Sequence, residues 1–521
     1  MDIFLAYSRE TGQLKESQAL VRLMKEKSGI VLKKPLGAYL DFDRSDNPSP
    51  DPIMGSLLPM VPAKAPVLLV PVVDKGRFLK FLEQTPWKIN APKDGVYSVD
   101  VPFPPGKVCL RFENGYVYIA PGEKTLAEDS VLLTPANVFD DGMKSIASVT
   151  LHVDRVPKQL RQTALALLEN QARGYASQNP LTGEAQRKLP SLVADHLVNF
   201  STQFLKDGRD ARFSVDMPNV RDVMDAELVI RPHPDTSFAK ILTAMDAGPS
   251  LFGSFVEKKS ALTTVVNLQV PQDIRNILPD VIEETWKQNI KSPNDKTEGS
   301  AYEGLYKSIL PTVRRGRLDL GVFVVSPIPT TMTVLAGVKG VEGKTFGKEV
   351  GLATKDLPEH LRKLWKLNAI DIPGMYFHKV EPERTGPKGG PPSPGANPFG
   401  PYPTYLGFKD NGAFLGAGIN ALNELHKLNA LSPKAAPLAY VSVDIRSFVE
   451  MTFSNRRDKD LVRRLFAINR PGYIRATLSS GSDLRLNTEV DFRFLRFYQE
   501  SERAGGPSRP GPGRKKEGLR K

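Results

Sequence analysis

The sequence predicts an α+β fold made of two similar halves, each of mostly antiparallel sheet with helices packed on one face. Short apolar segments alternate along the chain with segments of helical periodicity. Two Asn-Gly pairs, Asn114-Gly115 and Asn411-Gly412, also lie between apolar runs. Asn-Gly is a strong hairpin signal because a type I′ turn needs positive φ at both central residues. Hairpins need antiparallel neighbours, so the pattern argues against a wholly parallel α/β sheet.

The order of the predicted elements repeats along the chain. The hairpin segments FENGYVYIAPG (112–122) and FKDNGAFLGAG (408–418) are each followed by a strand ending in aspartate, TLHVD at Asp154 and YVSVD at Asp444. Helical patterning and two further strand-like segments follow in both cases, at 211–217 with 226–232 and at 473–480 with 484–492. The sequence therefore predicts a first half at 1–247 and a second at 248–500, with matching hairpins and aspartates in equivalent positions.

Three aspartates stand at predicted junctions between a strand and a helix. They are Asp74, Asp154 and Asp444. A carboxylate in this position accepts hydrogen bonds from the unpaired N–H groups of the first helical turn and complements the positive end of the helix dipole. The repetition of the pattern favours a structural role over a catalytic one. We therefore predict helix capping at all three residues.

One segment interrupts the second predicted half and another follows it, and the second of these carries much of the charge. Residues 385–404 contain seven prolines in twenty positions and predict an irregular insertion in the second half. Residues 501–521 predict a disordered, basic tail that is rich in Pro and Gly. From 503 onward, seven Lys and Arg stand against one Glu, so this part accounts for +6 of the net charge of +13. The remaining excess is diffuse and typical of a soluble protein.

Composition limits the classes of function. The chain has 521 residues, of which 40% are hydrophobic and 25% charged, as in globular proteins. No apolar run is long enough to predict a transmembrane segment. The single cysteine, Cys109, lies in an alternating KVCLRF segment and predicts a small buried hydrophobic residue. We expect a periplasmic or extracellular location if a signal peptide precedes Met1, and a cytoplasmic one otherwise.

The motifs that resemble catalytic or ligand-binding patterns each fail on spacing. GVKGVEGKT (337–345) has five residues between glycines where a phosphate-binding loop has four, and no helix is predicted directly after it. DFDRSDNPSPD (41–51) lacks the glycine of a calcium loop and predicts a solvated acidic loop. The six histidines are scattered without a cysteine partner or a pair at i, i+4. We therefore predict no catalytic residue, no metal site and no cofactor.

One internal stretch is a candidate for binding anions. Residues 455–475 hold seven basic residues against two acidic ones. The candidate anion-binding residues are Arg456, Arg457, Arg463, Arg464 and Arg470. Positions three and four residues apart would share one helical face, but the interleaved acids favour an ordinary solvated surface.

Several segments of the predicted strands and helices resemble segments of other proteins. They are KKPLGAYLDF (33–42), APVLLVPVVDKGRFLKFLE (65–83), NGYVYIA (114–120), SVTLHVD (148–154), GRLDLGVFVV (316–325) and AYVSVDIRSFVEM (439–451). Over about residues 1–500 the chain resembles a group of uncharacterised, usually exported bacterial proteins of planctomycete-type genomes. The resemblance implies a duplicated α+β fold and an extracytoplasmic location, and it brings no reaction or site residues.

Taken together, these observations predict a non-enzymatic binding or scaffolding protein of the bacterial cell envelope. Its expected partner is an anionic polymer or another envelope protein. Two alternatives stay open: a hydrolase-type enzyme whose residues converge only in three dimensions, and a binder of anionic polymers through residues 455–475.

Overall fold

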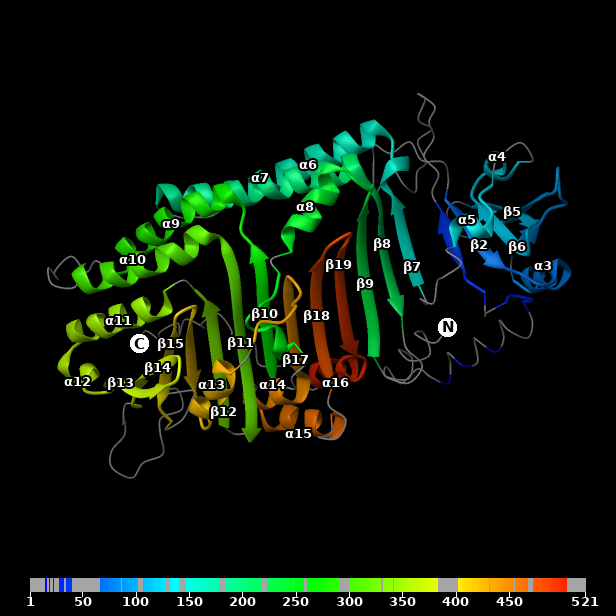
Figure 1. Cartoon of the computed structure of the whole chain (residues 1–521). Helices are drawn as coiled ribbons and strands as arrows, with labels where there is room; N and C mark the ends of the chain where they lie inside the picture. Colours follow the sequence, from blue (N-terminus) through cyan, green and yellow to red (C-terminus); the bar gives the residue numbers. More distant parts are fainter. Residues whose placement is uncertain are drawn as a thin grey trace, which may run out of the picture. The chain divides into compact units, whose positions relative to one another are not determined.

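The fold is α+β, as predicted, with one six-stranded and one 13-stranded sheet in which the registered strand pairs are antiparallel (Figure 1). The computed structural model describes residues 15, 18, 22, 28–31, 34–39, 66–85, 87–101, 106–127, 132–139, 147–177, 183–216, 223–246, 248–256, 260–290, 299–328, 331–340, 342–382, 402–430, 432–452, 455–466 and 472–503. The chain forms two compact units, Met1–Ala164 with Ser214–Asp222, and Leu165–Phe213 with Val223–Lys521. The predicted boundary at 247 stays a prediction.

The smaller sheet belongs to the first unit and has the strand order β1-β2-β6-β5-β4-β3. Its strands are β1 (Gly37–Tyr39), β2 (Val67–Pro71), β3 (Lys88–Ile89), β4 (Val96–Asp100), β5 (Lys107–Glu113) and β6 (Tyr116–Ala120), and its helices are α3 (Lys75–Glu83), α4 (Glu123–Leu126) and α5 (Pro135–Val138). Asn114 and Gly115 form the two-residue turn between β5 and β6, with φ of 53° and 72°. The first predicted hairpin is confirmed.

The larger sheet has the order β13-β14-β15-β16-β12-β11-β10-β17-β18-β19-β9-β8-β7. Its strands are β7 (Ala147–His152), β8 (Gly208–Asp216), β9 (Val223–Pro232), β10 (Leu262–Gln269), β11 (Arg317–Ile328), β12 (Thr331–Lys339), β13 (Trp365–Ile372), β14 (Met375–Val380), β15 (Thr404–Lys409), β16 (Gly412–Ala417), β17 (Ala439–Asp444), β18 (Tyr473–Ser480) and β19 (Leu484–Asp491). Its neighbouring helices are α6 (Lys158–Ser177), α7 (Glu184–Asp207), α8 (Ser237–Met245), α9 (Gln272–Ile290), α10 (Gly299–Arg315), α11 (Gly343–Ala353), α12 (Glu359–Arg362), α13 (Ala421–Asn429), α14 (Ile445–Thr452), α15 (Arg456–Leu465) and α16 (Arg493–Arg503).

The second predicted hairpin exists, but its turn is shifted by one residue. Lys409 pairs with Gly412, so the turn consists of Asp410 and Asn411, and Gly412 is the first residue of β16. A Cβ on Gly412 would come within 3.1 Å of the Val338 carbonyl oxygen and 3.2 Å of the Phe414 ring, and the N-terminus of α11 approaches this residue through Gly343. A Cβ on Gly343 would come within 2.2 Å of the Gly412 carbonyl oxygen. The predicted Asn-Gly turn at this position is therefore wrong.

Helices pack against both faces of the larger sheet, which corrects the prediction of a single covered face. Neighbouring residues of a strand point to opposite faces. On β15, Gly407 lies opposite Phe414, which packs in the same core as Leu425 of α13, whereas the adjacent Phe408 contacts Phe346 of α11. Helices α13 and α11 therefore cover opposite faces of this part of the sheet.

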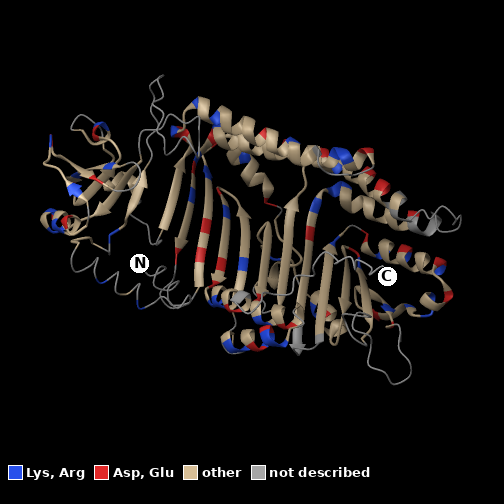
Figure 2. Cartoon of the chain, turned by 180° about the vertical axis from the view of Figure 1, so that it is seen from behind, with Lys and Arg blue, Asp and Glu red and all other residues tan. Residues whose placement is uncertain are grey.

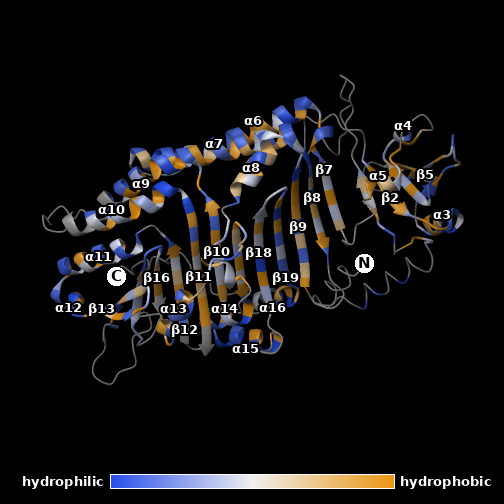
Figure 3. Ribbon diagram, in the orientation of Figure 1, coloured by the Kyte–Doolittle hydropathy of each residue, from blue (hydrophilic) through white to orange (hydrophobic). Residues whose placement is uncertain are grey.

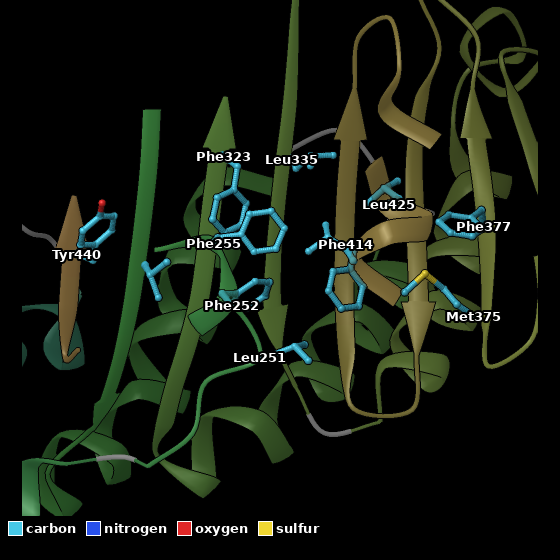
Figure 4. Close-up of a cluster of buried hydrophobic side chains, with 12 residues drawn as sticks. Leu251, Phe252, Phe255, Phe323, Leu335, Met375, Phe377, Phe414, Leu425 and Tyr440 are labelled. Carbon is cyan, nitrogen blue, oxygen red and sulfur yellow. The ribbon is translucent and has the colours of Figure 1, made fainter. Parts of the chain in front are cut away.

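The main core of the second unit lies on the face covered by α13 and by the short 3₁₀ helix η2 (Gly253–Phe255) (Figure 4). Phe252 is fully buried there, with ring centroids 6.1 Å from Phe323 and 6.3 Å from Phe414. Gly321 and Gly337 on the sheet leave room for this ring, since a Cβ on either would come within 2.8 Å of it. Small residues on the sheet thus accommodate large rings from the covering loop.

The predicted caps have different outcomes. Asp74 accepts a hydrogen bond from the Arg77 amide at 3.1 Å, and Asp444 accepts one from the Ser447 amide at 2.7 Å. Both predictions are confirmed. Asp154 instead lies inside a 3₁₀ helix, η1 (Val153–Arg155), which has no side-chain cap. The capping prediction for Asp154 is wrong because β7 ends one turn before α6 begins, so the carboxylate does not precede the helix.

Asp444→Ala is expected to lower the free energy of unfolding by about 1 kcal/mol, the usual cost of losing a helix cap. Asp444→Asn keeps an acceptor for the Ser447 amide and should recover most of that loss. Urea unfolding of both variants measures the difference. Equal losses in the two variants would contradict the capping role.

Parts of the predicted insertion and tail lie outside the described residues. Residues 385–401 of the insertion belong there, and β15 begins at Thr404. At the C-terminus, α16 continues to Arg503, and the Ser501 hydroxyl donates to the buried Asp458 at 3.1 Å. The helix thus includes the first three residues of the predicted tail, and residues 504–521 lie outside the described residues.

Candidate functional site

A broad apolar surface covers one face of the larger sheet within the second unit. Residues paired across antiparallel strands share a face, so the register defines rows that cross β11, β10, β17, β18, β19 and β9. The first row is Val324, Leu262, Val443, Ile474, Val490 and Met224; the second is Val322, Thr264, Val441, Ala476, Thr488 and Ala226; the third is Leu320, Val266, Ala439, Leu478, Leu486 and Leu228. We call these residues the apolar face. None of them is charged, and two threonines supply the only side-chain polar groups.

The centre of the apolar face is open. Val441 and Leu486 are each 39% exposed, and most of the other residues are half-buried. Val265, which is on β10 but points to the opposite face, is fully buried in the core. Hydrophobic residues recur along these strands (Figure 3). Exposed apolar patches of this extent are unusual in monomeric proteins and mark interaction sites.

The opposite face of β18, β19 and β9 carries mainly polar and charged residues, with Val229 buried among them. Arg475 pairs with Glu489 at 3.1 Å, and Arg485 pairs with Glu227 at 3.5 Å across neighbouring strands. Arg485 also contacts Asp483, and this hydrogen bond lowers the pKa of the Asp483 carboxyl. Charged residues along the strands of the larger sheet are visible in Figure 2. The sheet is therefore amphipathic in this region, and the charges on its polar face compensate each other.

Helices border the apolar face at both ends of its strands. At one end, the Ser480 hydroxyl, on the same side of β18 as Ile474, donates to the Leu242 carbonyl oxygen of α8. Phe238 of α8 in turn packs against Phe200 and Phe204 of α7, with distances between ring centroids of 5.2 Å and 5.8 Å. At the other end, Ile474 packs against the hydrophobic cluster of α14, α15 and α16. The open part of the apolar face thus lies between α8 and the group α14–α16.

Helix α7 carries an apolar stripe that continues beyond its contact with α8. Val193 and Leu197 precede Phe200 and Phe204 on one helical stripe, at the spacing i, i+4, i+7 and i+11. The two phenylalanines pack on α8, whereas Val193 and Leu197 are 42% and 58% exposed. The border near α8 is therefore apolar.

The border formed by α14, α15 and α16 contains most of the predicted anion-binding residues. Arg463 pairs with the buried Glu450 at 3.0 Å, and Arg464 pairs with Glu500 at 2.6 Å. Arg456 is 95% exposed and lies 3.8 Å from Asp460. Arg457, at the start of α15, donates its backbone amide to Asn455, and Arg470 lies outside the described residues. The structure places four of the five predicted arginines on one helix, where Arg456, Arg463 and Arg464 form intramolecular ion pairs.

The segment GVKGVEGKT joins a strand to a helix, because α11 begins at Gly343. This corrects the expectation that no helix follows the segment. The helix N-terminus is occupied by the turn between β15 and β16: the Gly343 amide donates to the Asp410 carbonyl oxygen at 3.1 Å, and Lys344 pairs with the Asp410 carboxylate at 2.9 Å. These contacts give the segment a packing role. The acidic segment 41–51 lies outside the described residues.

Cys109 and His378 are two of the buried titratable groups. Cys109 is fully buried in β5, as predicted, and burial raises the pKa of its thiol. His378 on β14 is also buried, and burial lowers the pKa of its imidazole. Its Nδ1 accepts from the Asn368 amide at 3.1 Å, and its Nε2 donates to the Gly347 carbonyl oxygen at 2.9 Å. The neutral imidazole therefore joins α11 to the sheet.

The described residues contain no group of three or more His, Cys, Asp and Glu side chains that could hold a metal ion. In the same part of the chain, no helix combines the length and hydrophobicity needed to cross a membrane. No family model, curated protein or solved structure matches the chain.

Sequence analysis missed the apolar face. The alternation of apolar and polar residues in YIRATLSS and LRLNTEVD was a usable signal, because it indicates strands with one apolar side. Whether that side is open depends on pairing between segments that are more than 200 residues apart, such as β9 and β19.

Proposed function

We propose that the chain is a non-enzymatic binding protein of the bacterial cell envelope, and that the apolar face binds a hydrophobic ligand. The observation that carries this proposal is the uncharged, partly open face of six adjacent strands. Interior strands have paired backbone groups, so the surface offers side-chain contacts and no edge for strand addition. The envelope location and membership in the exported bacterial group belong to the proposal and are supported by the sequence resemblance.

A duplication of the two halves is also part of this proposal, and strand order supports it. The order β3-β4-β5-β6-β2-β1 in the smaller sheet corresponds to β13-β14-β15-β16-β12-β11 in the larger one. The order β7-β8-β9 likewise corresponds to β17-β18-β19, and each of these triplets has two helices between its first and second strands. In this interpretation β9 and β19, the last strands of the two halves, pair with each other.

Binding through the apolar face can be tested with N-phenyl-1-naphthylamine, an apolar dye that fluoresces in hydrophobic surroundings. We expect the folded protein to bind the dye and Leu486→Glu to weaken binding at least tenfold. The reason is that the substitution removes about 1.5–3 kcal/mol of apolar burial and adds a charge. Fluorescence titration of the purified chain measures the affinity.

The matched control is Asn487→Glu. Asn487 is the next residue of β19, is also exposed, and points to the polar face. This variant should bind the dye as the parent chain does, and circular dichroism should show that both variants are folded. A Leu486→Glu variant that binds the dye as well as the Asn487→Glu variant does would contradict the proposed function.

A further inference from the structure

We propose that the ligand of the apolar face is an anionic lipid, with its acyl chain along the strands and its headgroup at the border formed by α14, α15 and α16. This inference rests on the proposed function, because it names the ligand of the same surface. Three features of the second unit support it: the chemistry of the face, its length along the strands, and the difference between its two borders.

The chemistry of the face suits an acyl chain. Its side chains are aliphatic apart from Met224 and the two threonines, Thr264 and Thr488. The polar partners that fix the orientation of a folded protein, such as charged side chains, are missing from all three rows. An acyl chain needs no hydrogen bonds and gains only from apolar burial, at about 0.8 kcal/mol per CH₂ group.

The length of the face also fits. From Ile474, which packs against α14–α16, to Ser480, which contacts α8, β18 rises by six residues. At about 3.3 Å per residue, this distance is roughly 20 Å. The hydrocarbon core of a bilayer is about 30 Å thick, so the chains of one leaflet extend about 15 Å. The borders cover Ile474 and Ser480 themselves, so an acyl chain of about 15 Å spans most of the distance between the two borders.

The two borders differ in charge, which orients the lipid. Helices α14, α15 and α16 carry nine basic side chains against five acidic ones, a net charge of +4. Glu450, Glu500 and Asp460 form intramolecular pairs and are already subtracted in this net charge, and Asp491, just before α16, pairs with Arg493. The opposite border continues into the exposed Val193 and Leu197 of α7. The free end of the acyl chain is thus placed toward α7 and α8, and the anionic headgroup of the lipid toward α14–α16.

The test is displacement of the bound dye from the full-length chain by two single-chain lipids below their micelle concentrations, lysophosphatidylglycerol (anionic) and lysophosphatidylcholine (zwitterionic). We expect the anionic lipid to displace the dye at a concentration at least fivefold lower, and Arg456→Glu with Arg464→Glu to abolish that preference. The matched control, Lys188→Glu with Lys363→Glu, makes the same charge change at exposed residues of α7 and beside α12 and should keep the preference. In parallel, sedimentation velocity measures the oligomeric state of the parent chain and of the Leu486→Glu and Asn487→Glu variants.

The failures of the two proposals are distinguishable. If the dye does not bind at the apolar face, the proposed function itself fails. If the dye binds there but neither lipid displaces it, or if both lipids displace it equally, the lipid proposal is overturned and the proposed function stands. A dimer that dissociates only in Leu486→Glu would also overturn the lipid proposal, because a second copy of the chain would then cover the face. Displacement by a synthetic amphipathic helix but by neither lipid would assign the face to a protein partner.

Discussion

Phe252→Ala is expected to lower the free energy of unfolding of the second unit by about 4 kcal/mol. Phe252 is fully buried between Phe323 and Phe414, over Gly321 and Gly337. Removing the ring loses its burial and leaves a cavity, and Phe→Ala substitutions in cores cost about 3–5 kcal/mol. The two glycines have no side chains that could fill the space, so little of the cavity can collapse.

Urea unfolding with hydrogen exchange of the β10 and β11 peptides measures the effect and assigns it to the second unit. The control is Phe448→Ala on α14, whose side chain is 40% exposed, and it should cost less than half as much. A loss for Phe252→Ala no greater than that of the control would show that the core contacts contribute little. The folded Phe252→Ala variant should still bind the apolar dye, because Phe252 packs on the face of the sheet opposite to Leu486.

Local signals predicted the fold class, and packing decided the details. Asn114-Gly115 forms the predicted turn because both residues reach the positive φ that this turn requires. The same pair of residues at Asn411-Gly412 does not form the turn, because Gly412 pairs with Lys409 as the first residue of β16. Asp444 and Asp154 end similar segments, yet only Asp444 directly precedes an α-helix. The shared pattern does not distinguish these cases, because the residues that follow the aspartate form a 3₁₀ helix in one case and an α-helix in the other.

The candidate site depended even more on long-range pairing. Leu486 and Leu228 are separated by more than 250 residues, and they become neighbours only through the register of β19 with β9. Each strand alone predicts an apolar side, and most such sides are covered in a folded protein. Here helices α8 and α14–α16 cover only the ends of the strands. The sequence of the strands does not show where these helices pack. The arginines of 455–475 were visible in the sequence, but their pairing with Glu450 and Glu500 was not.

The second large effect is expected at Asp319, whose carboxylate on β11 holds the loop that carries Phe252. The side chain is fully buried and accepts hydrogen bonds from the Ser250 hydroxyl at 2.6 Å and from the Leu251 amide at 2.9 Å. Asp319→Ala would leave both donors buried without their acceptor, at about 1–3 kcal/mol each. We therefore expect a loss of about 3 kcal/mol in the free energy of unfolding, measured by the same urea and hydrogen-exchange experiment.

Two further variants separate the hydrogen bonds from the packing of the loop. Asp319→Asn keeps one acceptor oxygen and should lose about half as much stability as Asp319→Ala, whereas Ser250→Ala removes one donor and leaves the Leu251 amide bonded to Asp319. In a double-mutant cycle, Asp319→Ala and Ser250→Ala should be clearly non-additive, because both delete the same contact. Additive losses would mean that the carboxylate does not position the loop. Non-additive losses, together with increased exchange of the 248–255 segment, would show that one buried carboxylate keeps Phe252 in the core, on the side of the sheet opposite to the apolar face.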